Sequence, residues 1–335
     1  MKTLTNLFTL ALMISACAPA TPIGTDTLPT PVPQEYQDFG YYLSWSPDDQ
    51  LLAVTTNTGL YVYDTNTFNQ LEAFSGFSGS TVVFSSKFMA AINGNGVYVW
   101  SRKDYSLLFQ EKVADPIQFQ SVSISPEENW LVTGEQKQFR LWSLPEGEVV
   151  AKFPINGFAS NLAFTDNSTL IVIEQYKAIV QEWDLHDQKQ LGSFEIPRDV
   201  LFFTLSEDGR VMFADYGEAG VELWDVGTGE PVHYYQQMQG ASGWTRLSGD
   251  HQTGIVWGYA VDGYNSGMGV WDLAKDQRIH EFSTSYVNGD GWRSGALNSD
   301  GTILAASNNE GYIYFYDLKS GETIGEIYLP YKFIF

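Results

Sequence analysis

The stretch VELWDVGTGEPVHYY, at residues 221–235, reads as two short strands joined by a turn, because residues common in β-strands flank Asp225 and a Gly-rich segment. Six other stretches repeat this pattern of a strand, an aromatic residue, Asp or Ser, a turn and a second strand. The seven aromatic markers are Tyr63, Trp100, Trp142, Trp183, Trp224, Trp271 and Tyr316, at spacings of 37, 42, 41, 41, 47 and 45 residues. A period this regular predicts a repeated structural unit.

A second pattern lies about twenty residues before each marker. Examples are YYLSWSPDDQLLAVT at 41–55 and GALNSDGTILAAS at 295–307, where a turn of Ser, Pro, Asp, Asn or Gly joins two apolar strands. Each unit is therefore predicted to contain four antiparallel strands joined by hairpins. The Asp that follows most markers is expected to form an Asx-turn, which starts the last hairpin of the unit.

Four strands repeating with a Trp-Asp pair at the end of the third strand resemble the WD40 family of β-propellers. The resemblance covers residues 41–329, and five of the seven markers are followed by Asp. The Gly-His pair expected in that family is missing from every repeat. The fold class that we predict is all-β: a seven-bladed propeller of four-stranded antiparallel blades over residues 41–335, preceded by a signal peptide and a Pro-rich tether.

The closure of the ring has three possible forms in the sequence. The seventh repeat already has its own last strand, at 323–329, so the first strand of the chain is not needed to complete it. Residues 34–39 could instead add an outer strand, or the blades could close through side-chain packing alone. The terminal YKFIF could also begin an eighth repeat. Seven blades agree best with the seven markers.

The N-terminus is predicted to be an export signal. Lys2 and a short apolar run end in Ile14-Ser15-Ala16-Cys17, which resembles the lipobox of bacterial lipoproteins. That resemblance implies removal of residues 1–16 and lipidation of Cys17, with residues 17–40 as a Pro-rich tether. The expected location is the bacterial cell envelope, outside the cytoplasm and attached to a membrane through lipidated Cys17. The alternative is an ordinary secretory signal with an incidental cysteine.

Composition limits the partners. Forty acidic and eighteen basic residues give a net charge of -22, so nucleic acid is not expected as a partner. Cys17 is the only cysteine, which excludes a disulfide within the chain and a cysteine-rich zinc site.

No catalytic or metal-binding pattern emerges from the sequence. His186, His233, His251 and His280 do not have metal-ligand spacing. GFSGS at 76–80 lacks the second Gly of a nucleophile elbow, and the loop at 262–267 lacks the alternating acidic ligands of a calcium site. We therefore assign no catalytic residue and expect no metal and no cofactor. Whether the protein is an enzyme stays open, and the residues favour a protein without catalytic activity.

Three long loops of the last three repeats carry the candidate binding residues. The loops at 236–244, 259–269 and 283–295 are predicted to lie on one face, called the top face of a propeller, and are rich in glycine. Aromatic residues and arginine dominate binding hot spots. The candidates are Trp244, Arg246, Tyr264, Tyr286, Asp290, Trp292 and Arg293. Alternatively, these loops fold back onto the ring and their aromatic residues cap the core.

The function that we expect is a membrane-anchored, non-catalytic platform that binds or scaffolds a protein, peptide or glycan on its top face. The alternative is an exported propeller enzyme, either a quinoprotein-like dehydrogenase or a hydrolase that uses carboxylates at the central channel. The segment WDVGTGEPV, at 224–232, is similar to quinoprotein repeat turns, but one cysteine cannot supply the adjacent pair that many quinoproteins carry.

Overall fold

A computed structural model describes residues 34–36, 40–77, 81–94, 96–112, 119–197, 200–236, 238, 244–259, 265–285, 291–329 and 332–334. Residues 36–332 form one compact unit. The predicted signal peptide, Cys17 and nearly all of the predicted tether lie outside the described residues. No helix in the described part of the chain is long and apolar enough to cross a membrane.

Almost every described element is a β-strand, as the repeats predict. The strands are β1 (Gln34–Tyr36), β2 (Tyr42–Trp45), β3 (Leu51–Thr55), β4 (Gly59–Asp64), β5 (Gln70–Ser75), β6 (Thr81–Phe84), β7 (Phe88–Asn93), β8 (Gly96–Ser101), β9 (Leu107–Lys112), β10 (Ser121–Ile124), β11 (Trp130–Gly134), β12 (Gln136–Ser143), β13 (Val149–Phe164), β14 (Thr169–Glu174), β15 (Ile179–Asp184), β16 (Lys189–Glu195), β17 (Phe202–Leu205), β18 (Val211–Asp215), β19 (Val221–Asp225), β20 (Glu230–Tyr235), β21 (Trp244–Leu247), β22 (Thr253–Tyr259), β23 (Asn265–Asp272), β24 (Gln277–Ser285), β25 (Trp292–Leu297), β26 (Ile303–Asn308), β27 (Tyr312–Asp317), β28 (Thr323–Tyr328) and β29 (Lys332–Ile334). Two 3-10 turns, η1 (Gln175–Lys177) and η2 (Gly217–Ala219), interrupt them.

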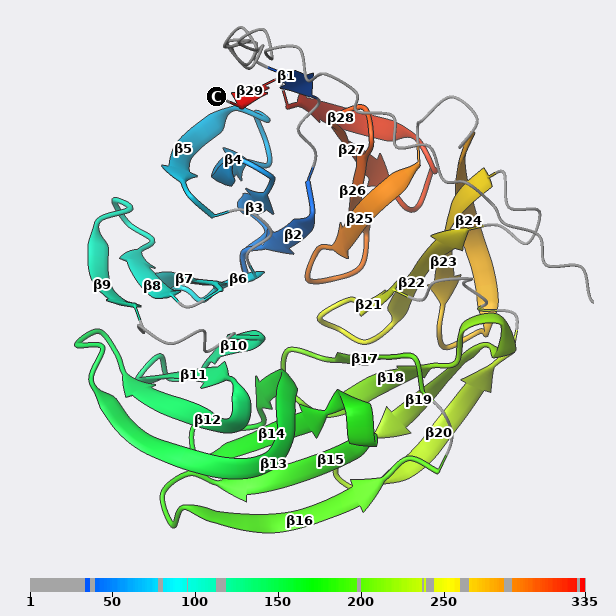
Figure 1. Ribbon diagram of the computed structural model, residues 1–335. Helices are drawn as coiled ribbons and strands as arrows, with labels where there is room; N and C mark the ends of the chain where they lie inside the picture. Colours follow the sequence, from blue (N-terminus) through cyan, green and yellow to red (C-terminus); the bar gives the residue numbers. More distant parts are fainter. Residues whose placement is uncertain are drawn as a thin grey trace, which may run out of the picture. The chain divides into compact units, whose positions relative to one another are not determined.

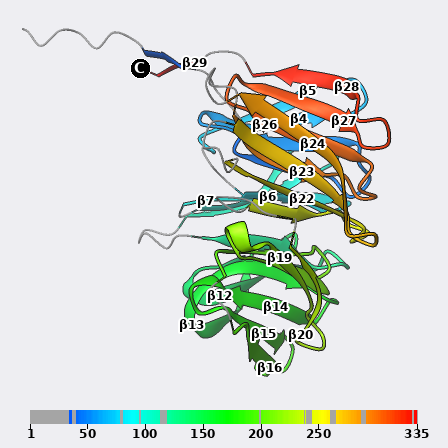
Figure 2. The same ribbon diagram turned by 90° about the vertical axis from the view of Figure 1, so that its right-hand side faces the viewer.

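Within residues 36–332, small antiparallel sheets are arranged as in a β-propeller (Figure 1). Five of them have four strands each: β2–β5, β6–β9, β17–β20, β21–β24 and β25–β28. The first strands of the repeats lie innermost, and each contacts the next around the ring, in the order β2, β6, β10, β13, β17, β21 and β25, with β25 again contacting β2. Figure 2 shows β23 and β24 side by side, in agreement with their antiparallel pairing.

The prediction of seven separate four-stranded sheets is corrected by residues 121–195. Here β10 to β16 form one seven-stranded sheet, so the described residues contain five four-stranded sheets and not seven. The two groups are joined because β13 runs unbroken for sixteen residues, pairing with β12 through its first part and with β14 through its last part.

The continuity of β13 has a local cause. Apolar residues continue through the expected connection, where Phe153, Ile155 and Ala159 are all buried. Ser121 Oγ donates a hydrogen bond of 2.7 Å to the carbonyl of Ala159, which ties the middle of β13 to β10. A Cβ atom on Gly134 would lie 2.2 Å from that carbonyl, so glycine is required for this close approach. The segment is thus held extended where the sequence predicts a turn.

The core lies between neighbouring sheets. Each cluster of buried apolar side chains draws its members from two consecutive repeats, and one cluster joins the first repeat to the last. Six of the marker aromatics are buried, and Tyr316 is partly buried. The markers therefore pack between sheets, since a single sheet of four strands cannot bury both of its faces.

The Asp after the marker caps the following hairpin, as predicted. Asp225 Oδ1 accepts a hydrogen bond of 2.8 Å from the backbone N–H of Thr228, and Asp317 Oδ1 accepts one of 2.8 Å from Ser320. Asp64, Asp184 and Asp272 do the same for the residue three positions further on. These Asx-turns explain why the marker is followed by Asp in five of the repeats.

The first hairpin turn of several repeats has one residue in the left-handed conformation, with φ between 58° and 67°. Where that residue has a side chain, the side chain reaches the preceding repeat. Glu128 accepts hydrogen bonds of 2.8 Å from Ser86 Oγ and from the N–H of Lys87, and His251 Nε2 lies 3.1 Å from Asp208 Oδ1. Where it is Gly301, a Cβ atom would lie 2.5 Å from Thr253 Oγ1 of the preceding repeat. The turns therefore link neighbouring repeats either by a side chain or by close backbone approach.

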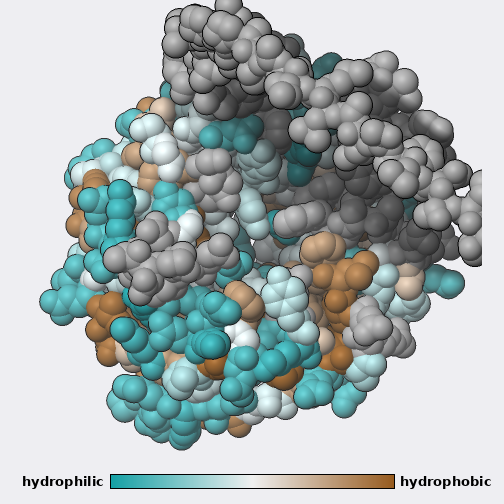
Figure 3. Space-filling model, in the orientation of Figure 1, coloured by the Kyte–Doolittle hydropathy of each residue, from teal (hydrophilic) through white to brown (hydrophobic). Residues whose placement is uncertain are grey.

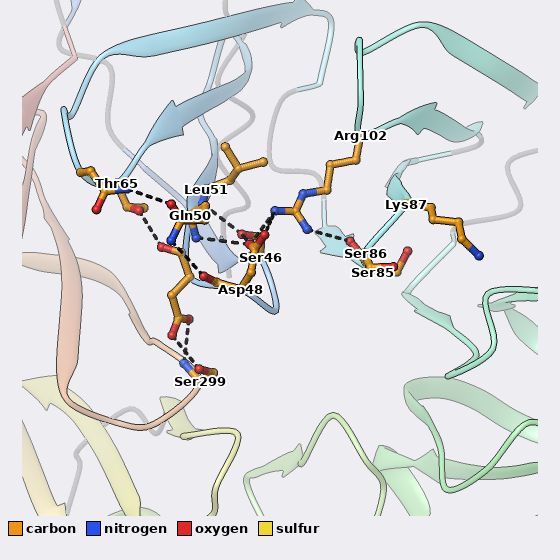
Figure 4. Close-up of polar contacts among 12 residues, drawn as sticks. Ser46, Asp48, Gln50, Leu51, Thr65, Ser85, Ser86, Lys87, Arg102 and Ser299 are labelled. Carbon is orange, nitrogen blue, oxygen red and sulfur yellow. Dashed lines mark hydrogen bonds and ion pairs between the residues drawn. The ribbon is translucent and has the colours of Figure 1, made fainter.

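The first and last repeats are also joined by a side chain of a hairpin turn, and neither repeat contributes a strand to the sheet of the other. Asp49, in the left-handed position of the first repeat, accepts hydrogen bonds from the N–H and Oγ of Ser299 in the last repeat, at 2.9 and 2.6 Å (Figure 4). Trp45 Nε1 also donates to the carbonyl of Ala296 at 3.1 Å, and the ring centroids of Phe68 and Phe315 lie 4.7 Å apart. Of the three possible forms of closure, side-chain packing between complete sheets is observed.

The described residues nearest the two ends of the chain pair with each other. Strands β1 and β29 form a two-stranded sheet of their own. Residues 34–36 therefore do not add an outer strand to the sheet β25–β28, and the C-terminal segment does not begin a further four-stranded sheet among the described residues.

Candidate functional site

Two cavities lie along the inner strands and share part of their walls. The first, the strand-lined cavity, has a volume of about 440 Å³ and receives residues from the innermost strand of every repeat. The second, the turn-lined cavity, has a volume of about 540 Å³ and receives residues from the first hairpin turns of the first five repeats. The shared lining residues are Ser44, Val83, Val122, Leu162, Leu205 and Glu207. Both volumes fall in the range of about 300–1,000 Å³ that is typical of ligand sites.

The walls of the strand-lined cavity carry hydroxyl and amide groups and few charges. Thr81, Gln120, Ser160 and Asn161 line it from the second, third and fourth repeats. Arg246 and Glu207 are the charged residues among its described lining residues. Such a wall can donate and accept many hydrogen bonds, while its two charges fix the orientation of a bound molecule.

Arg246 extends from the sixth repeat toward the first. It is the third residue of β21, and its guanidinium carbon lies 5.8 Å from the ring centroid of Tyr42, the first residue of β2. Nη1 donates a hydrogen bond of 2.8 Å to the carbonyl of Thr245. The seventh repeat lies between these two and contributes Ala296 to the lining of the same cavity. The position gives a half-buried positive group in a chain of net charge -22.

Glu207 lies in the first hairpin turn of the fifth repeat and lines both cavities. Its side chain is exposed to solvent, and neighbouring protein displaces part of the water around it. Removal of water by the surrounding protein raises the pKa of this carboxyl, and the nearby carboxylates of Asp208 and Asp49 raise it further.

Other carboxylates of the turns already have partners. Burial acts to raise the pKa of Asp48, but hydrogen bonds from Arg102 and Ser46 outweigh it and lower the pKa to about 2 (Figure 4). For Glu128 the balance is the same, and the Lys87 ammonium 2.9 Å away helps to lower its pKa to about 2. These two side chains fasten neighbouring repeats, which leaves Glu207 as the carboxylate of the shared cavity wall.

The predicted binding residues fall into three groups. Tyr264, Tyr286 and Asp290 lie outside the described residues, and for Trp244 only the backbone, at the start of β21, is described. Arg246 lies in β21, not in one of the three loops, and lines the strand-lined cavity. The predicted cluster of all seven residues on one face thus stays a prediction.

Trp292 and Arg293 are adjacent in β25 but have different surroundings. Trp292 is buried between two repeats, where Nε1 donates a hydrogen bond of 2.9 Å to the carbonyl of Phe282 and the ring packs against Tyr314 and Tyr316. This position favours packing over contact with a partner. Arg293 is exposed, and its Nε donates to Asn309 Oδ1.

The histidines are separate from one another. His186, His233 and His251 each contact a single carboxylate, while His280 Nε2 lies 2.6 Å from the carbonyl of Leu318. Among the described residues, no group of three or more His, Cys, Asp or Glu side chains is arranged to hold a metal ion.

On the face shown in Figure 3, hydrophilic residues cover much of the described surface. Comparison with known proteins finds no family model that matches the chain and no curated protein that matches it. The function therefore has to be argued from the cavities and their residues.

Sequence reasoning missed Glu207 and the setting of Arg246. A signal for the second exists in the repeats. The third residue of the inner strand is Ser44 in the first repeat, Val83 in the second and Thr204 in the fifth, and only the sixth repeat places a charged residue, Arg246, at this position. An alignment of the inner strands of the repeats would have identified Arg246 as a residue of the cavity wall.

Proposed function

We propose that the protein is a membrane-anchored propeller of the WD40 type that acts outside the cytoplasm as a non-catalytic platform for a protein, peptide or glycan. In this proposal the seven-stranded sheet counts as two blades that share β13, which gives seven repeats around the ring. The observation that carries the proposal is the strand-lined cavity, in which Arg246 offers a guanidinium among hydroxyl and amide groups. This combination suits recognition by hydrogen bonds and one charge.

The binding role is tested by a photoreactive residue placed at Gln120, which lines the strand-lined cavity. In cells, this residue is expected to form a covalent adduct with the partner. Arg246→Gln should reduce the adduct by tenfold or more, because a hydrogen bond to a charged group contributes about 1.5–3 kcal/mol. Arg278→Gln, a matched change at an exposed arginine outside the lining of both cavities, should leave it unchanged. Absence of an adduct, or equal adduct in both variants, would contradict the proposal.

The membrane anchor rests on Ile14-Ser15-Ala16-Cys17, whose match to a lipobox implies lipidation of Cys17. We expect Cys17→Ser to abolish incorporation of labelled fatty acid and to release the protein from the membrane fraction, because no acyl chain can then hold it. Thr27→Ser, in the proposed tether, serves as the control and should behave as the unaltered protein. Retention of Cys17→Ser in membranes would show that the signal was misread.

The hydrolase form of the enzyme alternative is favoured by two neighbouring carboxyl groups, Glu207 and Asp208, that line the turn-lined cavity together, where nearby charge and loss of water raise the pKa of Glu207. A carboxyl with a raised pKa is suited to general acid catalysis. If the protein is a hydrolase, it should hydrolyse a substrate and Glu207→Gln should abolish that activity. A binding platform should show no hydrolysis.

A further inference from the structure

The wall that the two cavities share is aliphatic apart from Ser44 and Glu207. Its aliphatic members come from the inner strands of the second to fifth repeats and are Val83, Val122, Leu162 and Leu205. In the turn-lined cavity, the last residues of three of these strands add more apolar surface: Phe84, Ile124 and Phe164. A ligand with an apolar body can therefore remove much of its own apolar surface from water in the turn-lined cavity.

One carboxylate in the lining of the turn-lined cavity has no partner among the described residues. The cavity is lined by the carboxylates of Glu128, Glu207 and Asp208. Glu128 accepts a hydrogen bond of 2.8 Å from the N–H of Lys87, and Asp208 Oδ1 lies 3.1 Å from His251 Nε2. Glu207 forms no hydrogen bond and no ion pair with any described residue. Its carboxylate is therefore the charged group that a ligand in this cavity can engage.

The surroundings of Glu207 favour a cation over an anion. Loss of water to the neighbouring protein raises the pKa of its carboxyl, and the negative charges of Asp208 and Asp49 raise it further. The same charges that oppose ionisation of Glu207 attract a cation to this position and repel an anion. No Lys, Arg or His occurs among the described lining residues of the turn-lined cavity, so the lining itself supplies no cation.

The apolar wall decides which kind of cation matches the cavity. An inorganic ion would gain nothing from aliphatic side chains, whereas an organic cation can place its charge at Glu207 and its hydrocarbon part against that wall. A lysine side chain of a partner protein would bring only a four-carbon stem. The cavity volume of about 540 Å³ accommodates a larger body, which favours a free amine.

We propose that the turn-lined cavity binds a small organic amine, with its ammonium group at Glu207 and its hydrocarbon body against the shared aliphatic wall. This inference goes beyond the proposed function, because it concerns the turn-lined cavity and does not involve Arg246 or Gln120, which line only the other cavity. Binding requires both parts of the ligand, so the charge and the hydrocarbon body can be tested separately.

Calorimetry with the purified protein at neutral pH compares hexylamine with hexanol, hexanoate and butylamine. Hexylamine should bind at least tenfold more tightly than hexanol, because a hydrogen bond between charged groups contributes about tenfold or more to affinity. It should bind roughly tenfold more tightly than butylamine, because each CH₂ group that leaves water strengthens binding about three- to fourfold. Hexanoate should bind more weakly than hexanol, because its charge is repelled.

Two variants assign the charge preference to one residue. Glu207→Gln should remove the preference for hexylamine over hexanol and keep the preference for hexylamine over butylamine. Glu127→Gln changes an acidic residue of another first hairpin turn that lines neither cavity, and it should keep both preferences.

Equal binding of hexylamine and hexanol would overturn the inference, and so would a preference that survives Glu207→Gln. Tighter binding of Nα-acetyl-lysine amide than of hexylamine would also overturn it, because the site would then belong to a lysine side chain of a partner protein. The ligand comparisons use the unaltered protein, so they do not depend on the folding of a variant. The adduct at Gln120 tests the strand-lined cavity, so failure of either experiment leaves the other result standing.

Discussion

Arg140→Met is expected to lower the free energy of unfolding by about 3–5 kcal/mol, because it leaves the buried Glu135 without its positive partner. Arg140 lies in β12 and Glu135 joins β11 to β12, and their side chains are buried, with exposed fractions of 8% for Arg140 and 1% for Glu135. Arg140 Nη2 donates to Glu135 Oε2 at 3.1 Å, and Nε lies 2.6 Å from Oε1 in an ion pair that is not aligned as a hydrogen bond. Chemical denaturation at neutral pH measures the change.

The loss of stability caused by Arg140→Met should depend on the pH and on the charge of Glu135. Burial raises the pKa of Glu135 even though Gln138 and Arg140 act to lower it, so removal of Arg140 should raise it further. Lowering the pH should therefore reduce the effect of Arg140→Met, as Glu135 becomes neutral. The double variant Glu135→Gln/Arg140→Met should recover most of the lost stability. Arg102→Met, which breaks the half-exposed pair with Asp48, should cost only about 1 kcal/mol. A loss of that small size for Arg140→Met would contradict the prediction.

Asp215→Asn is expected to raise the free energy of unfolding at pH 8, the opposite direction from most substitutions in a core. Asp215 is fully buried at the end of β18. Its Oδ1 accepts a hydrogen bond of 2.7 Å from the N–H of Gly217, while Oδ2 has no hydrogen-bond partner in the described part of the chain. Burial raises its pKa from 3.8 to about 6, and the bond from Gly217 offsets this only in part. A charged carboxylate at this position therefore opposes folding at neutral pH.

The direction and the size of the change in the free energy of unfolding follow from the pKa of Asp215 in the folded state and in the unfolded state. The folded state holds the proton more tightly than the unfolded state, so the contribution of Asp215 to stability increases as the pH falls from about 6 to 3.8 and is unfavourable above about 6. A shift of this size corresponds to about 3 kcal/mol, which sets the largest gain expected for Asp215→Asn at pH 8. The gain should disappear at pH 4. Asp225→Asn, which changes a turn carboxylate in the same sheet, is the control and should give no gain. A gain that persists at pH 4 would exclude this origin.

The sequence predicted those features of the fold that depend on short stretches of the chain. Trp224 and Asp225 show why: the aromatic packs between sheets and the carboxylate caps its own hairpin, so both roles are visible in the repeat. The continuity of β13 could not be predicted in this way. It depends on the contact of Gly134 with the carbonyl of Ala159, which brings together residues far apart in the chain.

The candidate site was predicted only in part, for the same reason. Arg246 was recognised as a residue type suited to binding, but its place in the channel follows from the register of β21 against β22. Glu207 reads as an ordinary acidic turn residue, similar to Glu127. Glu207 directly follows Ser206, whereas Glu127 is the second residue after Ser125, and of these two residues only Glu207 lines the shared cavity wall.

Closure through Asp49, Trp45 and Phe68 has a consequence for the evolution of such chains. Every four-stranded sheet takes its strands from consecutive segments, so a repeat could be duplicated or lost at either end without breaking any hydrogen-bond ladder. The side chains that join the first repeat to the last would then have to become complementary again. In a ring that closes by sharing a strand between its two ends, the same event would leave one sheet incomplete. The hydrogen-bond ladders of the first and last sheets are thus independent of how many repeats the ring contains, and the angle between neighbouring sheets is what limits that number.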